Sequence, residues 1–178
     1  MHTRARLGAL AWIFVLAAAV GGCGGDDDDS SSNTTRNTRF PPPAEVENRP
    51  IQEGEGACGL LSRTEVESVA GVSVNPGDGV ATKGGTSSCA YRVRNNTAQY
   101  VGVIVQTEGG TNFENTSQAL GGAAEPLPGV GERAFVAKDT VYALKGGRLL
   151  ILTVSTTQPE PARKQAAIRL SQAAIGKV

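Results

Sequence analysis

Histidine, tryptophan and methionine are almost absent from this chain of 178 residues, which has one of each: His2, Trp12 and Met1. All three lie in a leading segment whose removal is predicted below. The mature chain would then lack histidine general bases, Ser-His-Asp triads and histidine metal ligands. Aromatic residues make up 4% of the sequence, which predicts a thin hydrophobic core.

A hydrophobic run long enough to cross a membrane is also missing. The longest uncharged apolar run covers residues 7–20, which is 14 residues. As a helix it would reach only about 21 Å, against about 30 Å for the hydrocarbon core of a bilayer. Because Arg4 and Arg6 precede it, the run is typical of the apolar part of a secretory signal peptide.

Small residues and a thiol follow that run, in the order Val20-Gly21-Gly22-Cys23. This pattern resembles the lipobox of bacterial lipoproteins, although leucine is more usual than valine at its first position. The resemblance implies that residues 1–22 are removed and that Cys23 becomes a diacylated (palmitate-bearing) N-terminus on the outer face of the cell membrane. The alternative is an ordinary signal peptide cut near Ala19, with Cys23 left as a free thiol.

Three cysteines leave an odd one in an exported protein. If Cys23 carries lipid, Cys58 and Cys89 remain as a pair, and an oxidising compartment favours a disulfide between them. Two acyl chains would anchor the chain stably, because each buried methylene adds about 0.8 kcal/mol.

Residues 23–55 are poor in apolar side chains and carry 8 acidic and 3 basic residues. Such a segment does not bury enough surface to offset its ordering entropy, so we expect a disordered acidic and proline-rich tether. The run Asp26–Asp29 could be interpreted as a calcium site, but it lacks the alternating ligands and glycine of an EF-hand loop. A solvated linker is the preferred interpretation.

Residues 56–178 are predicted to form one α+β domain with helix and strand signals in the order α-β-β-α-β-β-β-α. We expect a mostly antiparallel, five-stranded sheet with the helices packed on one side. A Ser62-x-x-Glu65 capping box begins the first helix, and Thr111-x-x-Glu114 begins the second. The expected elements are helices at 62–70, 111–120 and 157–174, the last with Pro159 inside its first turn, and strands at 88–94, 100–107, 133–138, 140–145 and 148–155.

Catalytic chemistry has little support in this domain. Ser87 and Ser88 lie in no nucleophile-elbow motif, and Lys83 is not spaced as a Ser-x-x-Lys base. With both cysteines paired and no histidine, no metal site or cofactor is expected. We therefore predict no catalytic residues and a protein that is not an enzyme. A histidine-free hydrolase remains as an alternative if Asp78, Lys83 and Ser87 gather in one cleft.

Tyr91, Arg92 and Arg94 are the candidate residues for a weak anion- or polymer-binding face on one strand. The alternative is an ordinary solvated sheet face. The domain carries 12 basic and 9 acidic residues, a balance too mild for nucleic acid.

The segment from Ala57 to Ser62, Glu65-Val66, and the later Ser88 to Tyr91 together resemble actinobacterial cell-envelope lipoproteins of unknown function. Those proteins share a C-x-L-L opening and a later C-x-(W/Y), and residues 129–135 also match their G-(L/V)-G-(D/E)-x-A segment. The resemblance implies an envelope domain with a Cys58–Cys89 disulfide and no known catalysis. Similar domains form the outer sensor portions of some bacterial receptor kinases.

These observations predict a lipid-anchored protein that presents a non-catalytic binding or sensing domain in the cell envelope. Its partners would be the membrane, through Cys23, and an envelope protein, glycan or lipid. The alternative function is a carrier that holds a small hydrophobic or lipid ligand between the sheet and the helices, where the alanine-rich stripe of the last helix could leave room.

Overall fold

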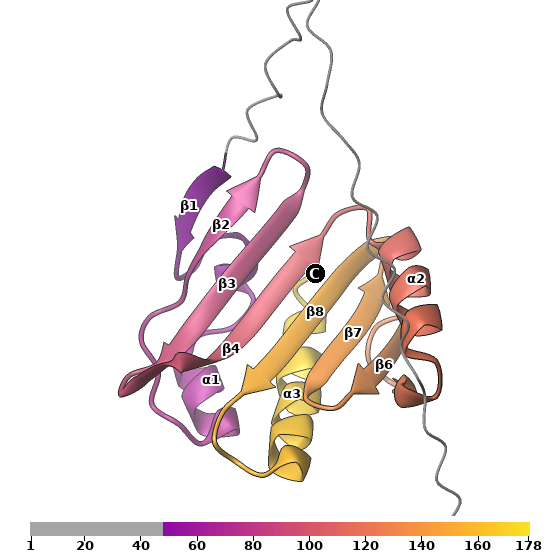
Figure 1. Ribbon diagram of the computed structural model, residues 1–178. Helices are drawn as coiled ribbons and strands as arrows, with labels where there is room; N and C mark the ends of the chain where they lie inside the picture. Colours follow the sequence, from indigo (N-terminus) through magenta and orange to yellow (C-terminus); the bar gives the residue numbers. More distant parts are fainter. Residues whose placement is uncertain (1–47) are drawn as a thin grey trace, which may run out of the picture. The chain divides into compact units, whose positions relative to one another are not determined.

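The computed structural model describes residues 48–178, so the predicted signal peptide, Cys23 and most of the predicted tether lie outside the described residues. Across the described range the chain forms one antiparallel sheet of eight strands, with three α-helices (Figure 1). The strands are β1 (Asn48–Gln52), β2 (Asp78–Thr82), β3 (Thr86–Val93), β4 (Asn96–Gln106), β5 (Glu125–Pro126), β6 (Arg133–Ala137), β7 (Thr140–Lys145) and β8 (Arg148–Ser155). The helices are α1 (Arg63–Ala70), α2 (Gly110–Leu120) and α3 (Glu160–Ile175), with short 3-10 turns η1 (Gly56–Gly59) and η2 (Gly121–Ala123).

The sheet has the strand order β1-β2-β3-β4-β8-β7-β6-β5. Its centre is the pair β4 and β8, which joins two strand groups that are each consecutive in the chain. The prediction of five strands is therefore wrong, and so is the predicted order, because β1, β2 and β5 were missed. All three lie at or next to an edge, are five residues or shorter, and lack regular apolar alternation.

Both edge strands carry a proline, Pro50 in β1 and Pro126 in β5. Proline cannot donate a backbone hydrogen bond, so it is tolerated at an edge and discourages pairing with a further strand. Because β1 begins at Asn48, part of the segment that we assigned to the tether belongs to the sheet.

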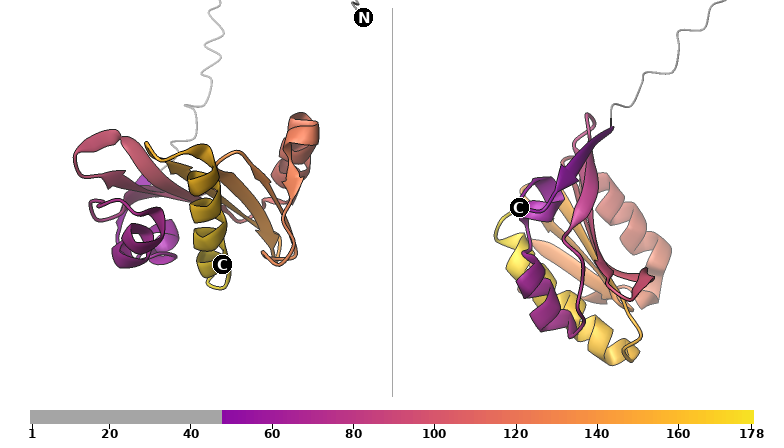
Figure 2. Two further views of the ribbon diagram at one scale, coloured as in Figure 1. Left: turned by 90° about the horizontal axis from the view of Figure 1, so that it is seen from below. Right: turned by 90° about the vertical axis from the view of Figure 1, so that its left-hand side faces the viewer.

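The helices cover both faces of the sheet and not one side as predicted. In β8, Leu150, Leu152 and Val154 are fully buried in the core shared with α1 and α3. The alternate residues Leu149 and Ile151 face the other way, where Leu149 packs with Phe113 of α2. Figure 2 shows α2 on the opposite face of the sheet from α1 and α3. A strand that is apolar on both sides therefore marks a sheet with helices on both faces.

Local sequence signals explain the first helix. The Ser62 hydroxyl accepts from the Glu65 N–H while the Glu65 carboxylate accepts from the Ser62 N–H, which confirms the capping box. Gly71 ends α1 in the left-handed region, with φ of 64°. The second predicted box is wrong: Gly109 caps α2 without a side-chain hydrogen bond.

Candidate binding site

The helix-facing side of β3 fixes η1 through three alternate residues. The Ser87 hydroxyl accepts from the Ala57 N–H at 2.8 Å, and Cys89 forms the predicted disulfide with Cys58. Tyr91 then places its hydroxyl within hydrogen-bond distance of two backbone carbonyls of the same segment, those of Leu61 and Cys58. Because alternate residues along a strand lie on the same face of the sheet, these three contacts form a continuous row. The row joins the chain before α1 to the sheet.

Tyr91 is fully buried within this row. Burial, together with the negative charges of Glu53 and Glu65, raises the pKa of Tyr91 to about 12 from an ordinary value of 10.0. The neutral hydroxyl therefore acts as a structural donor, and Tyr91 is not available at the surface.

The three residues proposed as a binding face are not brought together. Tyr91 faces the helices, whereas Arg92 is exposed on the opposite side of the strand. Arg94 lies just beyond β3, where its side chain donates to the Val74 carbonyl and pairs with Glu67 at 3.5 Å. Arg92 alone contributes to the surface described next.

The other face of the sheet is partly uncovered, because α2 packs on β7 and β8 and reaches β4 only at that strand's last residue, where Asn112 donates to Gln106 at 2.9 Å. No helix lies over β2, β3 and the middle of β4 on this side (Figure 2). One register row crosses this open face, with Val80 opposite Ser88, Ser88 opposite Ile104, and Ile104 opposite Ile151. A parallel row runs from Asp78 through Ala90 and Gly102 to Thr153. We refer to this surface of β2, β3, β4 and β8 as the open face.

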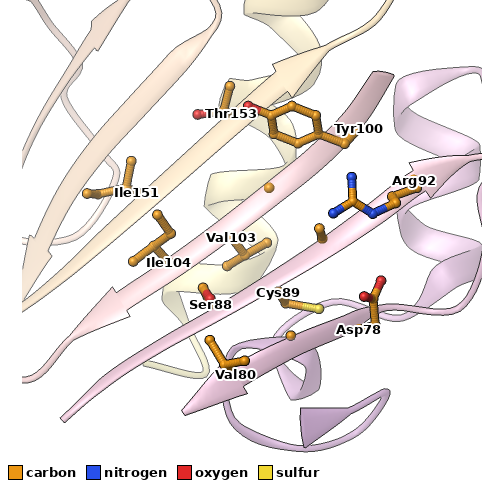
Figure 3. A pocket seen from close by; sticks show the side chains of 13 residues that line it. Asp78, Val80, Ser88, Cys89, Arg92, Tyr100, Val103, Ile104, Ile151 and Thr153 are labelled. Atoms are coloured by element: carbon orange, nitrogen blue, oxygen red, sulfur yellow. The ribbon is translucent and has the colours of Figure 1, made fainter. Parts of the chain in front are cut away.

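A hollow of about 390 Å³ lies on the open face (Figure 3). Its floor is apolar, with Val80, Ile104 and Ile151 contributed by three strands. Val80 is 41% exposed and is the most exposed large hydrophobic side chain recorded for residues 48–178. The apolar floor continues under α2, because Ile151 also packs against the cluster formed by Phe113 and Phe135. We refer to this hollow, whose lining residues all come from β2, β3, β4 and β8, as the trench.

Tyr100 covers part of the trench floor. A Cβ atom at Gly102 would lie 3.0 Å from Cε2 of the Tyr100 ring, so the ring rests on the backbone of its own strand. Figure 3 shows the Tyr100 side chain extending toward Thr153 of β8. Glycine at this position lets the ring lie flat, which leaves an aromatic surface at the end of the apolar floor.

The trench also carries charged groups of both signs. Asp78 and Arg92 both line the hollow, from β2 and β3. One N–H of the Arg92 guanidinium donates to the Thr97 carbonyl at 3.3 Å, and the planar group carries further donors. The trench therefore combines an apolar floor, one aromatic ring, a carboxylate and a guanidinium.

The residues of the hydrolase alternative do not gather in one cleft. Asp78 lines the open face, whereas Ser87 points to the helix side and holds η1. Lys83 lies in the turn between β2 and β3. Among residues 48–178, no group of three or more histidine, cysteine or acidic side chains is placed to bind a metal ion.

Sequence reasoning missed the floor of the trench. Val80 lies in β2, which was not predicted, and Ile104 was one of several apolar residues in a predicted strand. The sequence did contain one indication of this surface. The strand at 148–155 is apolar on both faces, which implies apolar neighbours on the second face of the sheet as well.

Comparisons of this sequence and structure with models of protein families, with curated proteins and with solved structures find no match. In the part of the chain that the structure covers, no helix has the length and apolar character needed to cross a membrane.

Proposed function

We propose that this protein is a lipoprotein anchored by Cys23 on the outer face of the cell membrane, where it presents a non-catalytic binding domain. The lipobox-like sequence at residues 20–23 supports the anchor. The Cys58–Cys89 disulfide agrees with an oxidising compartment and leaves Cys23 as the remaining cysteine.

The open face is the binding surface in this proposal. The observation that supports this choice is the apolar row Val80, Ile104 and Ile151. This row extends outward from the cluster under α2, and no helix lies over its residues in β2 and in the middle of β4 (Figure 2). Exposed apolar surface bordered by polar groups is typical of binding sites.

The interior offers less support for ligand binding. The helix-facing side chains of β4 and β8, including Val101, Val103 and Leu152, are fully buried in one cluster with α1 and α3. Because these side chains fill the space between the sheet and the two helices, we place binding on the open face and not between the layers.

A photo-crosslinking amino acid at Ser88 tests this proposal in intact cells. Ser88 lies on the trench floor, and Ser68 is a matched control on α1, across the sheet. We expect Ser88 to give an adduct with an envelope component and Ser68 to give none. Equal adducts from both positions, or none from Ser88 in folded, disulfide-bonded protein, would contradict the proposal.

A further inference from the structure

The ligand class of the open face follows from its mixed chemistry, on the assumption that the proposed function is correct. The trench offers Val80, Ile104 and Ile151 as apolar contacts and the Tyr100 ring as a flat surface. Hydrogen-bonding groups stand among them, including the Ser88 hydroxyl, the Asp78 carboxylate and the Arg92 guanidinium. A matching ligand needs apolar faces and both donors and acceptors at its rim.

The charges argue against two common ligand classes. An anion would gain from Arg92 but would be repelled by Asp78, which lines the same hollow. An acyl chain would leave the Asp78 and Arg92 groups desolvated without partners, which is unfavourable. A neutral ligand with many hydroxyl groups satisfies the carboxylate as a donor and the guanidinium as an acceptor.

A peptide in extended conformation also fits this face poorly. Peptides add to a sheet through an unpaired strand edge, but the trench is formed by β3, β4 and β8, which pair with neighbours on both sides. A peptide lying across these strands would bring its backbone N–H and C=O groups over an apolar floor without sheet partners. At the two edges of the sheet, β1 contains Pro50 and β5 contains Pro126. Proline has no backbone N–H to pair with an added peptide strand.

We infer that the open face binds a neutral saccharide chain, with the C–H face of a sugar ring on Tyr100 and the apolar floor. Asp78 accepts from sugar hydroxyl groups, and Arg92 donates to hydroxyl or ring oxygens. Because the hollow lies on the outer surface of the sheet, the rest of a saccharide chain can extend beyond it into solvent.

Isoleucine methyl groups report directly on this inference. Ile104 and Ile151 line the trench, whereas Ile51 and Ile168 belong to the helix-side core. Methyl NMR spectra of the full-length chain in phosphatidylcholine nanodiscs are recorded with maltohexaose, chitohexaose, mannohexaose and the neutral glycan fraction of the envelope. Octanoate and a mixed-sequence peptide serve as competing ligand classes.

We expect a neutral glycan to shift the Ile104 and Ile151 signals and to leave those of Ile51 and Ile168 in place. Tyr100→Ala should raise the Kd roughly tenfold, which corresponds to about 1.4 kcal/mol, because the sugar ring loses the aromatic surface on which it packs. Asp78→Asn and Arg92→Gln should each weaken binding. Arg169→Gln, an exposed arginine of α3, is the matched control for Arg92→Gln and should leave the Kd unchanged.

Two results would overturn the inference. If octanoate or the peptide shifts Ile104 and Ile151 while no neutral glycan does, the saccharide assignment is wrong and the proposed binding function stands. If neither these probes nor a whole envelope extract shifts the two signals, both the inference and the proposed function are wrong. Unchanged Ile51 and Ile168 signals in each variant show that it has folded.

Discussion

The hydroxyl of Tyr91 should make folding stability depend on alkaline pH. It is fully buried and reaches the carbonyl oxygens of Cys58 and Leu61. Since the folded pKa is about 12 and the ordinary value is 10.0, the unfolded chain loses this proton first as the pH rises. The free energy of unfolding therefore decreases as the pH rises from about 10 to about 12. At pH 11 it should be lower than at pH 8 by roughly 1.4 kcal/mol.

Tyr91→Phe separates this effect from other alkaline changes. The variant keeps the ring and loses the donor to the buried Leu61 carbonyl, while the Cys58 carbonyl still accepts from the Gly54 N–H. At pH 8 we expect a loss of about 1–3 kcal/mol. At pH 11 the difference in free energy of unfolding between wild type and variant should be smaller by roughly 1.4 kcal/mol, because phenylalanine has no proton to lose.

Urea unfolding followed by circular dichroism at pH 8 and pH 11 provides the measurement. The reasoning is refuted if wild type and Tyr91→Phe differ in free energy of unfolding by the same amount at both pH values. It is also refuted if the variant is as stable as wild type at pH 8, since the hydroxyl would then have no structural role.

Three further predictions concern the same core. Cys58→Ser opens a loop with a sequence separation of 31 and should cost about 3–4 kcal/mol, or roughly 10–15 °C in melting temperature; a melting curve that reductant leaves unchanged would contradict this. Gly77→Ala would place a Cβ 2.7 Å from the Tyr91 ring and 2.8 Å from the Cys89 sulfur, so thermal unfolding should show a loss of about 1–3 kcal/mol. Gly122→Ala, where a Cβ meets nothing within 4 Å, is its control and should show no comparable loss. Ser171→Ala removes a fully buried hydroxyl that has no hydrogen-bond partner in the structure and should raise the free energy of unfolding by about 1 kcal/mol; lower stability in urea would contradict the assignment.

The sequence predicts those elements whose signals are local. The Ser62 and Glu65 pair defines the start of α1. The alternating residues at 88–94 and 100–107, on either side of a turn expected at residues 95–97, predict the β3–β4 hairpin, which the structure closes slightly earlier, between Val93 and Asn96. Cysteine parity predicts the Cys58–Cys89 disulfide, which the structure confirms.

Elements that depend on tertiary pairing were not predictable in this way. β1 contains Pro50 and a single buried residue, Ile51, so its sequence resembles the tether before it. β5 has two residues, and its pairing with Phe135 and Val136 comes from the fold. The open face was missed for the same reason, because Val80 and Ile104 become neighbours of Ser88 only through the register of β2, β3 and β4.

Intact-mass analysis of the protein isolated from cell membranes tests the central claim most directly, with and without thiol alkylation before reduction. The account predicts a chain that begins at Cys23, carries the mass of two acyl chains, and takes up no alkylating reagent until the Cys58–Cys89 bond is reduced. A chain that begins elsewhere, an unmodified Cys23, or alkylation of Cys58 and Cys89 before reduction would contradict it.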